Sequence, residues 1–191
     1  MLRYILIYGV IAGGAVGVPL SILTLTMSGQ AMMQYGMLVG YLTMLIGLSA
    51  VFLAIKRHRD VDLGGVIRFW PALGLGLGIS FVAGVIYVIA WDVSCALAHA
   101  DFASTYARAM VAEQQAKGVS GAALERFRAE MEQFKVQYAN PLYRWPMTFA
   151  EIFPVGVIVS LVSAALLRNS RFMAARRGWN TGGGSLVSGN K

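Results

Sequence analysis

The chain has 191 residues, of which 57% are hydrophobic and 13% charged, and its mean hydropathy is +0.62. In a typical soluble domain about a quarter of the residues are charged. This composition therefore excludes an ordinary soluble globular protein and indicates a membrane protein, much of whose surface a bilayer covers. The formal net charge of +7 lies mostly in segments that flank apolar runs, which argues against nucleic acid as a partner. A single cysteine, Cys95, excludes an internal disulfide framework.

Four apolar runs are each long enough to cross a membrane. They cover residues 4–27, 32–55, 69–91 and 145–167, and only the fourth contains a charged residue, Glu151. A helix rises 1.5 Å per residue, so each run spans about 35 Å, against a hydrocarbon core of about 30 Å. Because lipid offers no partners for backbone N–H and C=O groups, all four are predicted to be helices. The first is too long for the core of a signal peptide, so we expect it to be retained.

Basic residues predict the orientation of these spans. Lys and Arg side chains gather in the loop 56–68 and in the segment after 167, whereas the long segment 92–144 has equal numbers of basic and acidic residues. The positive-inside rule therefore puts both termini and the basic loop in the cytoplasm and the segment 92–144 outside. We expect the basic segments to contact anionic lipid head groups.

The outer segment 92–144 is predicted to be a helical hairpin. Apolar residues recur there at three- and four-residue spacing, which is typical of one face of a helix. The two stripes are Phe102, Tyr106 and Met110, then Leu124, Phe127, Met131, Phe134 and Tyr138. The run 117–121 indicates a turn with Ser120 as a candidate N-cap, and Asn140-Pro141 is expected to end the second helix. The facing stripes either pack only on each other or offer a surface to a partner.

Glu151 is the main candidate for a functional site. Helix geometry puts it about 9 Å below the outer boundary of the fourth span, where an acid is costly unless it is protonated, paired or hydrated. Pro154 is expected to kink the helix beside it, and Thr148 and Arg144 lie on its side of the helix, with Arg144 able to approach from above. Asp92 marks the outer end of the third span. We interpret these residues as an intramembrane polar site, either a structural pairing of Glu151 or a site for a proton, a cation or a ligand head group.

Two other groups of residues suggest metal ligands but do not support a site. Asp92, Cys95 and His99 share one helix face, yet no second histidine lies in the outer segment. The four methionines between residues 27 and 37 have thioethers that could hold copper(I), but they fit lipid-compatible packing better. We therefore predict no metal, no cofactor and no catalytic residue.

Small residues recur at four-residue spacing in every span. In lipid, such faces let helix backbones approach closely, which favours internal packing of the spans or, alternatively, a homo-oligomer. The residues are Gly9, Gly13 and Gly17; Gly36 and Gly40; Gly74 and Gly78; Gly76, Ser80 and Gly84; and Gly156, Ser160 and Ala164. The glycines at 74–78 are not a nucleotide-binding loop, because no strand precedes them.

The last span carries a family resemblance. The segment 145–168, with its run Glu-Ile-Phe-Pro-Val-Gly at 151–156, resembles the last span of the domain-of-unknown-function 4199 family, and the order of elements over residues 1–172 is similar as well. The resemblance implies a small protein of the bacterial inner membrane and brings no known activity. The Gly- and Ser-rich residues 173–191 are expected to be a disordered cytoplasmic tail or the remnant of an expression tag.

Together these patterns predict an all-α fold, with residues 1–172 forming a four-helix transmembrane bundle and an extracytoplasmic helical hairpin between the third and fourth spans. The first functional hypothesis is non-enzymatic binding of another membrane protein, or self-association. The alternative is a small oligomeric transporter, or a membrane protein that binds a ligand or an ion at Glu151. A membrane enzyme is the least supported class.

Overall fold

The structure is a computed structural model that describes residues 1–26, 29–97 and 101–173, with the helix but not the side chains over 29–37. The described residues form helices joined by turns and loops. The helices are α1 (Leu2–Thr26), α2 (Gly29–Arg57), a π-helical turn (His58–Asp62), α3 (Phe69–Leu97), α4 (Phe102–Ala116), α5 (Gly121–Tyr138) and α6 (Pro141–Leu167). His99, the residues 174–191 and the side chains of the methionines at 27–37 lie outside the described part, and so do the predictions made for them.

Four of these helices are long and apolar enough to cross a membrane, which confirms the predicted helical class and the four spans. They are α1, α3, α6 and the stretch Leu38–Asp62, which consists of most of α2 and the π-helical turn. The helices extend beyond their apolar runs, by the most at one end in α3, which continues to Leu97, and in α6, which begins at Pro141 rather than at 145. The start of α6 follows capping rather than hydropathy, because the Asn140 side chain accepts a hydrogen bond from the Leu142 N–H and Pro141 occupies the first turn.

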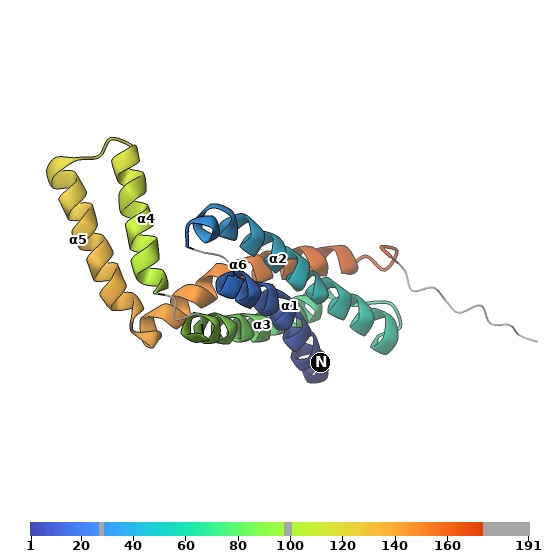
Figure 1. The fold of residues 1–191 in the computed structure, drawn as a ribbon. Helices are drawn as coiled ribbons and strands as arrows, with labels where there is room; N and C mark the ends of the chain where they lie inside the picture. The colour runs from blue at the N-terminus through green and yellow to red at the C-terminus, as the bar shows by residue number, and fades with distance from the viewer. Residues whose placement is uncertain (27–28, 98–100, 174–191) are drawn as a thin grey trace, which may run out of the picture.

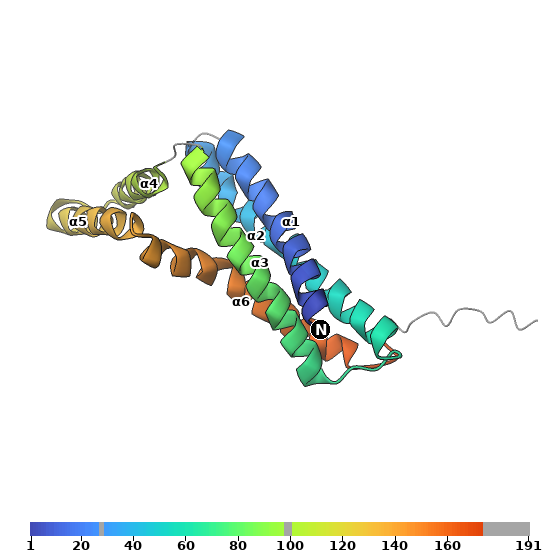
Figure 2. The same cartoon turned by 90° about the horizontal axis from the view of Figure 1, so that it is seen from below.

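The spans lie side by side (Figure 1). Helix α3 contacts both α1 and α6, and α2 also contacts both of these helices. Figure 2 shows the N-terminus, the loop between α2 and α3 and the end of α6 at one end of the spans, which we call the basic end. In the same view α6 leads away from α3 toward α4 and α5, which stand apart from the spans as a hairpin. We call that end the hairpin end.

The small residues of the spans are used where helices approach closely. A Cβ atom at Gly13 of α1 would lie 2.7 Å from Cβ of Ile86 on α3, and one at Gly156 of α6 would lie 2.6 Å from Cβ of Ser80. Other glycines with such close neighbours are Gly9, Gly17, Gly47, Gly76, Gly78 and Gly84. Internal packing therefore accounts for most of the small-residue faces, although a Cβ at Gly40 or Gly74 would meet nothing within 4 Å.

The hairpin has the facing stripes that its sequence predicts. The rings of Tyr106 on α4 and Phe134 on α5 have centroids 5.5 Å apart, and those of Phe102 and Tyr138 are 5.6 Å apart. Residue Ser120 occupies the N-cap position of α5, but its side chain makes no capping hydrogen bond.

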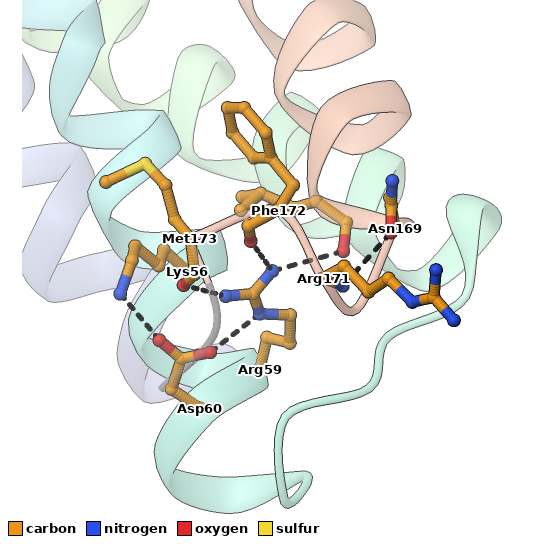
Figure 3. Close-up of polar contacts among 8 residues, drawn as sticks. Lys56, Arg59, Asp60, Asn169, Arg171, Phe172 and Met173 are labelled. Atoms are coloured by element: carbon orange, nitrogen blue, oxygen red, sulfur yellow. Dashed lines mark hydrogen bonds and ion pairs between the residues drawn. The ribbon is translucent and has the colours of Figure 1, made fainter. Parts of the chain in front are cut away.

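At the basic end, Arg59 fastens the end of α2 to the end of α6 (Figure 3). Its guanidinium is fully buried and donates to the carbonyls of Phe172 (2.9 Å) and Met173 (2.8 Å), with a longer contact of 3.5 Å to that of Leu167. Its Nε also pairs with Asp60 over 2.6 Å. Phe172 and Met173 lie in the turn that follows α6, and the five donors of an arginine can satisfy several carbonyls at once. Arg59 is thus a structural cross-link and, unlike Arg57 and Arg68 of the same loop, is not exposed.

Candidate functional site

A cavity of about 320 Å³ lies where the spans meet the hairpin, and all six α-helices contribute to its wall. Much of the lining on α1, α2 and α6 is apolar or has no side chain. These residues are Leu20, Leu23, Gly40, Met44 and Met147. Small residues of α6 such as Gly156 pack against α3, whereas Met147, Thr148 and Glu151 of the same helix line the cavity.

Glu151 reaches this cavity from α6. Its carboxylate accepts a hydrogen bond from the hydroxyl of Tyr87 on α3, with 3.3 Å between the oxygens. The buried Gly156, which packs on Ser80 of α3, lies roughly 140° away around the helix axis. The glycine face therefore holds the two helices together and leaves the acid at the cavity wall, as the helix geometry predicts. Thr148, one turn before Glu151, is buried and also lines the cavity.

Aromatic rings make up the largest part of the wall. Three come from the spans and four from the hairpin. The span residues are Tyr41, Tyr87 and Trp91, and the hairpin residues are Phe102, Tyr106, Phe134 and Tyr138. The hairpin rings form a connected cluster with centroid distances between 5.3 and 5.9 Å, and Trp91 joins it edge-on to Phe102 at 5.0 Å. The hairpin is thus part of the cavity and not a separate unit.

A buried hydrogen bond holds the hairpin against α3. The indole N–H of Trp91 donates to the hydroxyl oxygen of Tyr138 over 2.8 Å. Burial raises the pKa of Tyr138 to about 12, so its phenol stays protonated at neutral pH and keeps a neutral hydroxyl at the cavity wall.

Asp92 and Arg144 do not join Glu151. They form an ion pair with each other (Arg144 Nε to Asp92 Oδ1, 2.7 Å), and Asp92 also accepts from the indole N–H of Trp145 over 2.6 Å. The prediction that Arg144 could approach Glu151 is therefore corrected: its guanidinium is held at the start of α6 by the acid at the end of α3, and the partner of Glu151 is Tyr87.

The ion pair lines a second, polar groove of about 700 Å³ on the outside of the hairpin base. Its other lining residues include Cys95, Asp101, Glu132 and Lys135. Phe102 and Tyr138 line both spaces and so form their shared wall. The five predicted site residues thus divide into two in the cavity (Thr148 and Glu151), two in the groove (Asp92 and Arg144) and Pro154, which is exposed within α6 and lines neither.

The aromatic residues of α3 are functional candidates that the sequence patterns do not single out. Tyr87 and Trp91 are four residues apart and so share a helix face, which is the signal that could have identified them. A tyrosine in an apolar run indicates only ordinary packing, and the contact of Tyr87 with Glu151 depends on how α3 and α6 cross.

Comparisons with known proteins are consistent with the resemblance seen in the last span. No curated protein and no solved structure matches this chain significantly. A family model described as "Protein of unknown function (DUF4199)" matches residues 7–169, which extends from α1 to just beyond the end of α6 and includes both the cavity and the hairpin. The chain therefore belongs to the DUF4199 family.

Proposed function

We propose that this membrane protein binds a small molecule in the cavity that Glu151 lines. The observation that carries the proposal is one carboxylate at the wall of a space otherwise formed by apolar and aromatic side chains. Small-molecule sites have volumes of about 300–1,000 Å³ and are lined mainly by apolar and aromatic groups, with a few polar groups that orient the ligand. The cavity fits this description in both size and lining.

The polar groups of the cavity converge from different helices. Glu151 and Thr148 come from α6, Tyr87 from α3 and Tyr138 from α5. An acid within a span is costly, and by default it is a hypothesis of a functional site. A bound ligand can offset this free-energy cost, because it can interact with the carboxylate and the hydroxyls at the same time.

The ligand proposal is tested with a matched pair of glycines that both have open space beside them. A Cβ at Gly40 or at Gly74 would meet nothing within 4 Å, but only Gly40 lines the cavity. Wild-type protein, Gly40→Trp and Gly74→Trp are purified in parallel from their own membrane, and the bound small molecules are extracted and compared by mass spectrometry. We expect a species that the wild type and Gly74→Trp retain and that Gly40→Trp loses. Recovery of the same species in equal amounts from all three proteins would overturn the proposal.

For the membrane itself, we propose the bacterial inner membrane, with both termini in the cytoplasm and the hairpin outside. Exposed basic side chains at the basic end support this orientation and would contact anionic head groups there. They include Arg3, Arg57, Arg68, Arg168 and Arg171. The segment between α3 and α6 carries no such excess.

Single cysteines test this orientation in intact cells. In a Cys95→Ser background, one cysteine replaces Ala112 on α4 and, in a second protein, one replaces Leu63 in the basic loop; both positions are exposed. A membrane-impermeant maleimide should label the protein with a cysteine at 112 and spare the one with a cysteine at 63 until the cells are opened. The reverse pattern would invert the proposed topology.

Association with a second copy or another membrane protein is the second candidate function. Val136 and Leu142, near the junction of α5 and α6, are 75% and 78% exposed, and large exposed apolar side chains in a non-lipid region favour an interface. Replacing both with serine should dissociate a complex seen by native mass spectrometry without changing helix content. A complex that survives this change would exclude this surface as the interface.

A further inference from the structure

We infer that the ligand of the cavity is an organic cation, an ammonium-type group carried on an apolar body. This inference rests on the proposed binding function and names the chemical class of ligand. It depends on three features of the same wall: its charge, its rings and its size.

The described part of the wall contains one acidic side chain and no basic side chain to pair with it. Among the described residues that line the cavity, Glu151 is the one charged side chain, and none is a lysine, an arginine or a histidine. The recorded partner of its carboxylate is a neutral hydroxyl, that of Tyr87. The basic residue nearest in the sequence, Arg144, is engaged by Asp92 at the groove. A carboxylate in a low-dielectric site is stabilised by a cation, whereas an anionic ligand would be repelled and a neutral one would leave the charge unpaired.

The rings supply the second half of a cation site. The face of an aromatic ring carries negative charge and attracts ammonium and guanidinium groups, and clusters of such rings are how proteins recognise quaternary ammonium ligands. The cavity that Glu151 lines also has rings from α2, α3, α4 and α5 in its wall, and the hydroxyl of one of them, Tyr87, contacts the acid. One of these rings already holds a cation in the structure, since Cζ of Arg144 lies 5.8 Å from the ring centroid of Tyr138.

The size and the remaining lining set the body of the ligand. A volume of about 320 Å³ admits a small organic molecule and exceeds what a bare metal ion needs. Leu20, Leu23 and Met44 offer apolar contacts from α1 and α2. An ammonium at Glu151 with a hydrocarbon or aromatic body toward these residues satisfies both parts of the wall.

The test compares a cation with its neutral isostere. Phenyltrimethylammonium and tert-butylbenzene have the same shape and differ in one charge. Each is titrated by equilibrium dialysis against the full chain in nanodiscs of zwitterionic lipid, with empty nanodiscs as the blank. We expect wild-type protein to bind the cation at least about tenfold more tightly than the isostere, because a desolvated charge pair contributes more than the roughly 1.4 kcal/mol that a tenfold difference represents.

Two matched pairs of variants test which residues cause the tighter binding of the cation. Glu151→Gln should weaken cation binding at least about tenfold and leave the isostere unaffected, while Glu130→Gln, an exposed acid on α5 that does not line the cavity, should change neither. Tyr106→Phe keeps the ring and should bind the cation like the wild type, whereas Tyr106→Leu removes the ring and should bind it about threefold more weakly or worse.

The outcomes separate this inference from the proposed function. Equal affinity for the two probes, or cation binding that Glu151→Gln leaves unchanged, would overturn the cation while leaving a small-molecule cavity. Failure of the wild type to bind the cation overturns it as well. The proposed function falls only if the comparison of Gly40→Trp with Gly74→Trp also finds no ligand that depends on the cavity.

Discussion

Trp91 at the hairpin end of α3 and Tyr138 at the end of α5 are joined by a buried hydrogen bond of 2.8 Å between the indole nitrogen and the phenol oxygen. Both side chains are more than nine-tenths buried, and both rings contact Phe102 of α4. One polar contact thus brings together a span and the two helices of the hairpin. Since the same rings line the cavity, the bond also determines the position of the hairpin half of its wall.

Replacing Trp91 with phenylalanine should loosen the hairpin. The change keeps an aromatic ring but leaves the buried Tyr138 hydroxyl without its donor, which costs about 1–3 kcal/mol. We expect a lower free energy of unfolding in mixed micelles and faster amide exchange in α4 (Phe102–Ala116).

The matched change at the other partner is Tyr138→Phe, which leaves the indole N–H unpaired instead. The double variant should lose less stability than the sum of the two single losses, because the second change removes a group that the first has already orphaned. Strict additivity of the two losses would show that the hydrogen bond contributes nothing.

The fold follows from the sequence because its strongest signals are local. A span must satisfy its own backbone in lipid, so four apolar runs predict four helices, and a stripe at helical spacing predicts which side of α5 meets α4. The pairing of Tyr106 with Phe134 at 5.5 Å confirms that prediction. The start of α6 differs from that prediction because it is set by the N-cap Asn140 and not by the point where hydropathy rises.

The site is only partly predictable, because its contacts join residues that are far apart in the chain. Glu151 stands out as a lone acid in an apolar run, and Thr148 shares its wall. The partner of Glu151 is Tyr87, 64 residues away in the chain, and no local pattern encodes how α3 and α6 cross. Arg59 is similar: a basic residue in a loop suggests a solvated charge, and only the three-dimensional structure reveals the carbonyls that surround it.

Two neighbouring glycines in α1 test whether close helix contact stabilises the spans. A Cβ at Gly13 would lie 2.7 Å from Cβ of Ile86, whereas one at Gly14 would meet nothing within 4 Å. Gly13→Ala should therefore destabilise the protein by about 1–3 kcal/mol, as overpacking does. Gly14→Ala should be neutral or stabilise it by up to about 1 kcal/mol through helix propensity. Unfolding in mixed micelles measures both, and equal effects at the two positions would contradict the close approach of α1 and α3.

Arg59 should be the most sensitive basic residue of the chain. Arg59→Met would leave the carbonyls of Phe172 and Met173 without this donor and Asp60 without one of its cations, and removing one partner of a buried ion pair costs about 3–5 kcal/mol. Arg59→Lys keeps the charge but lacks the fork that reaches several carbonyls, so it should fall between Met and the wild type. The adjacent Arg57 is exposed, and Arg57→Met should change the stability by less than about 0.5 kcal/mol. Thermal unfolding in nanodiscs ranks the four proteins, and a mild Arg59→Met would rule out the cross-link.

Asp101 makes the stability of α4 depend on pH. It is the N-cap of α4, and its Oδ1 accepts from the Ser104 N–H over 3.0 Å. The hydrogen bonds with Ser104 lower the pKa of this carboxyl below its usual value. A group whose pKa is lower in the folded state stabilises that state above its unfolded pKa, here about 3.9, and loses this contribution as the pH falls through the folded pKa.

Amide protection of α4 should therefore decrease in acid, below about pH 4. Asparagine is an equally good N-cap, so Asp101→Asn should keep α4 protected near neutral pH and remove this part of the pH dependence. Asp101→Ala should lose about 1 kcal/mol of helix stability near neutral pH. Protection factors from hydrogen exchange, compared between the wild type and Asp101→Asn, isolate this carboxyl from the other hairpin acids, which titrate alike in both proteins. Identical pH profiles for those two proteins would show that the cap acts without its charge.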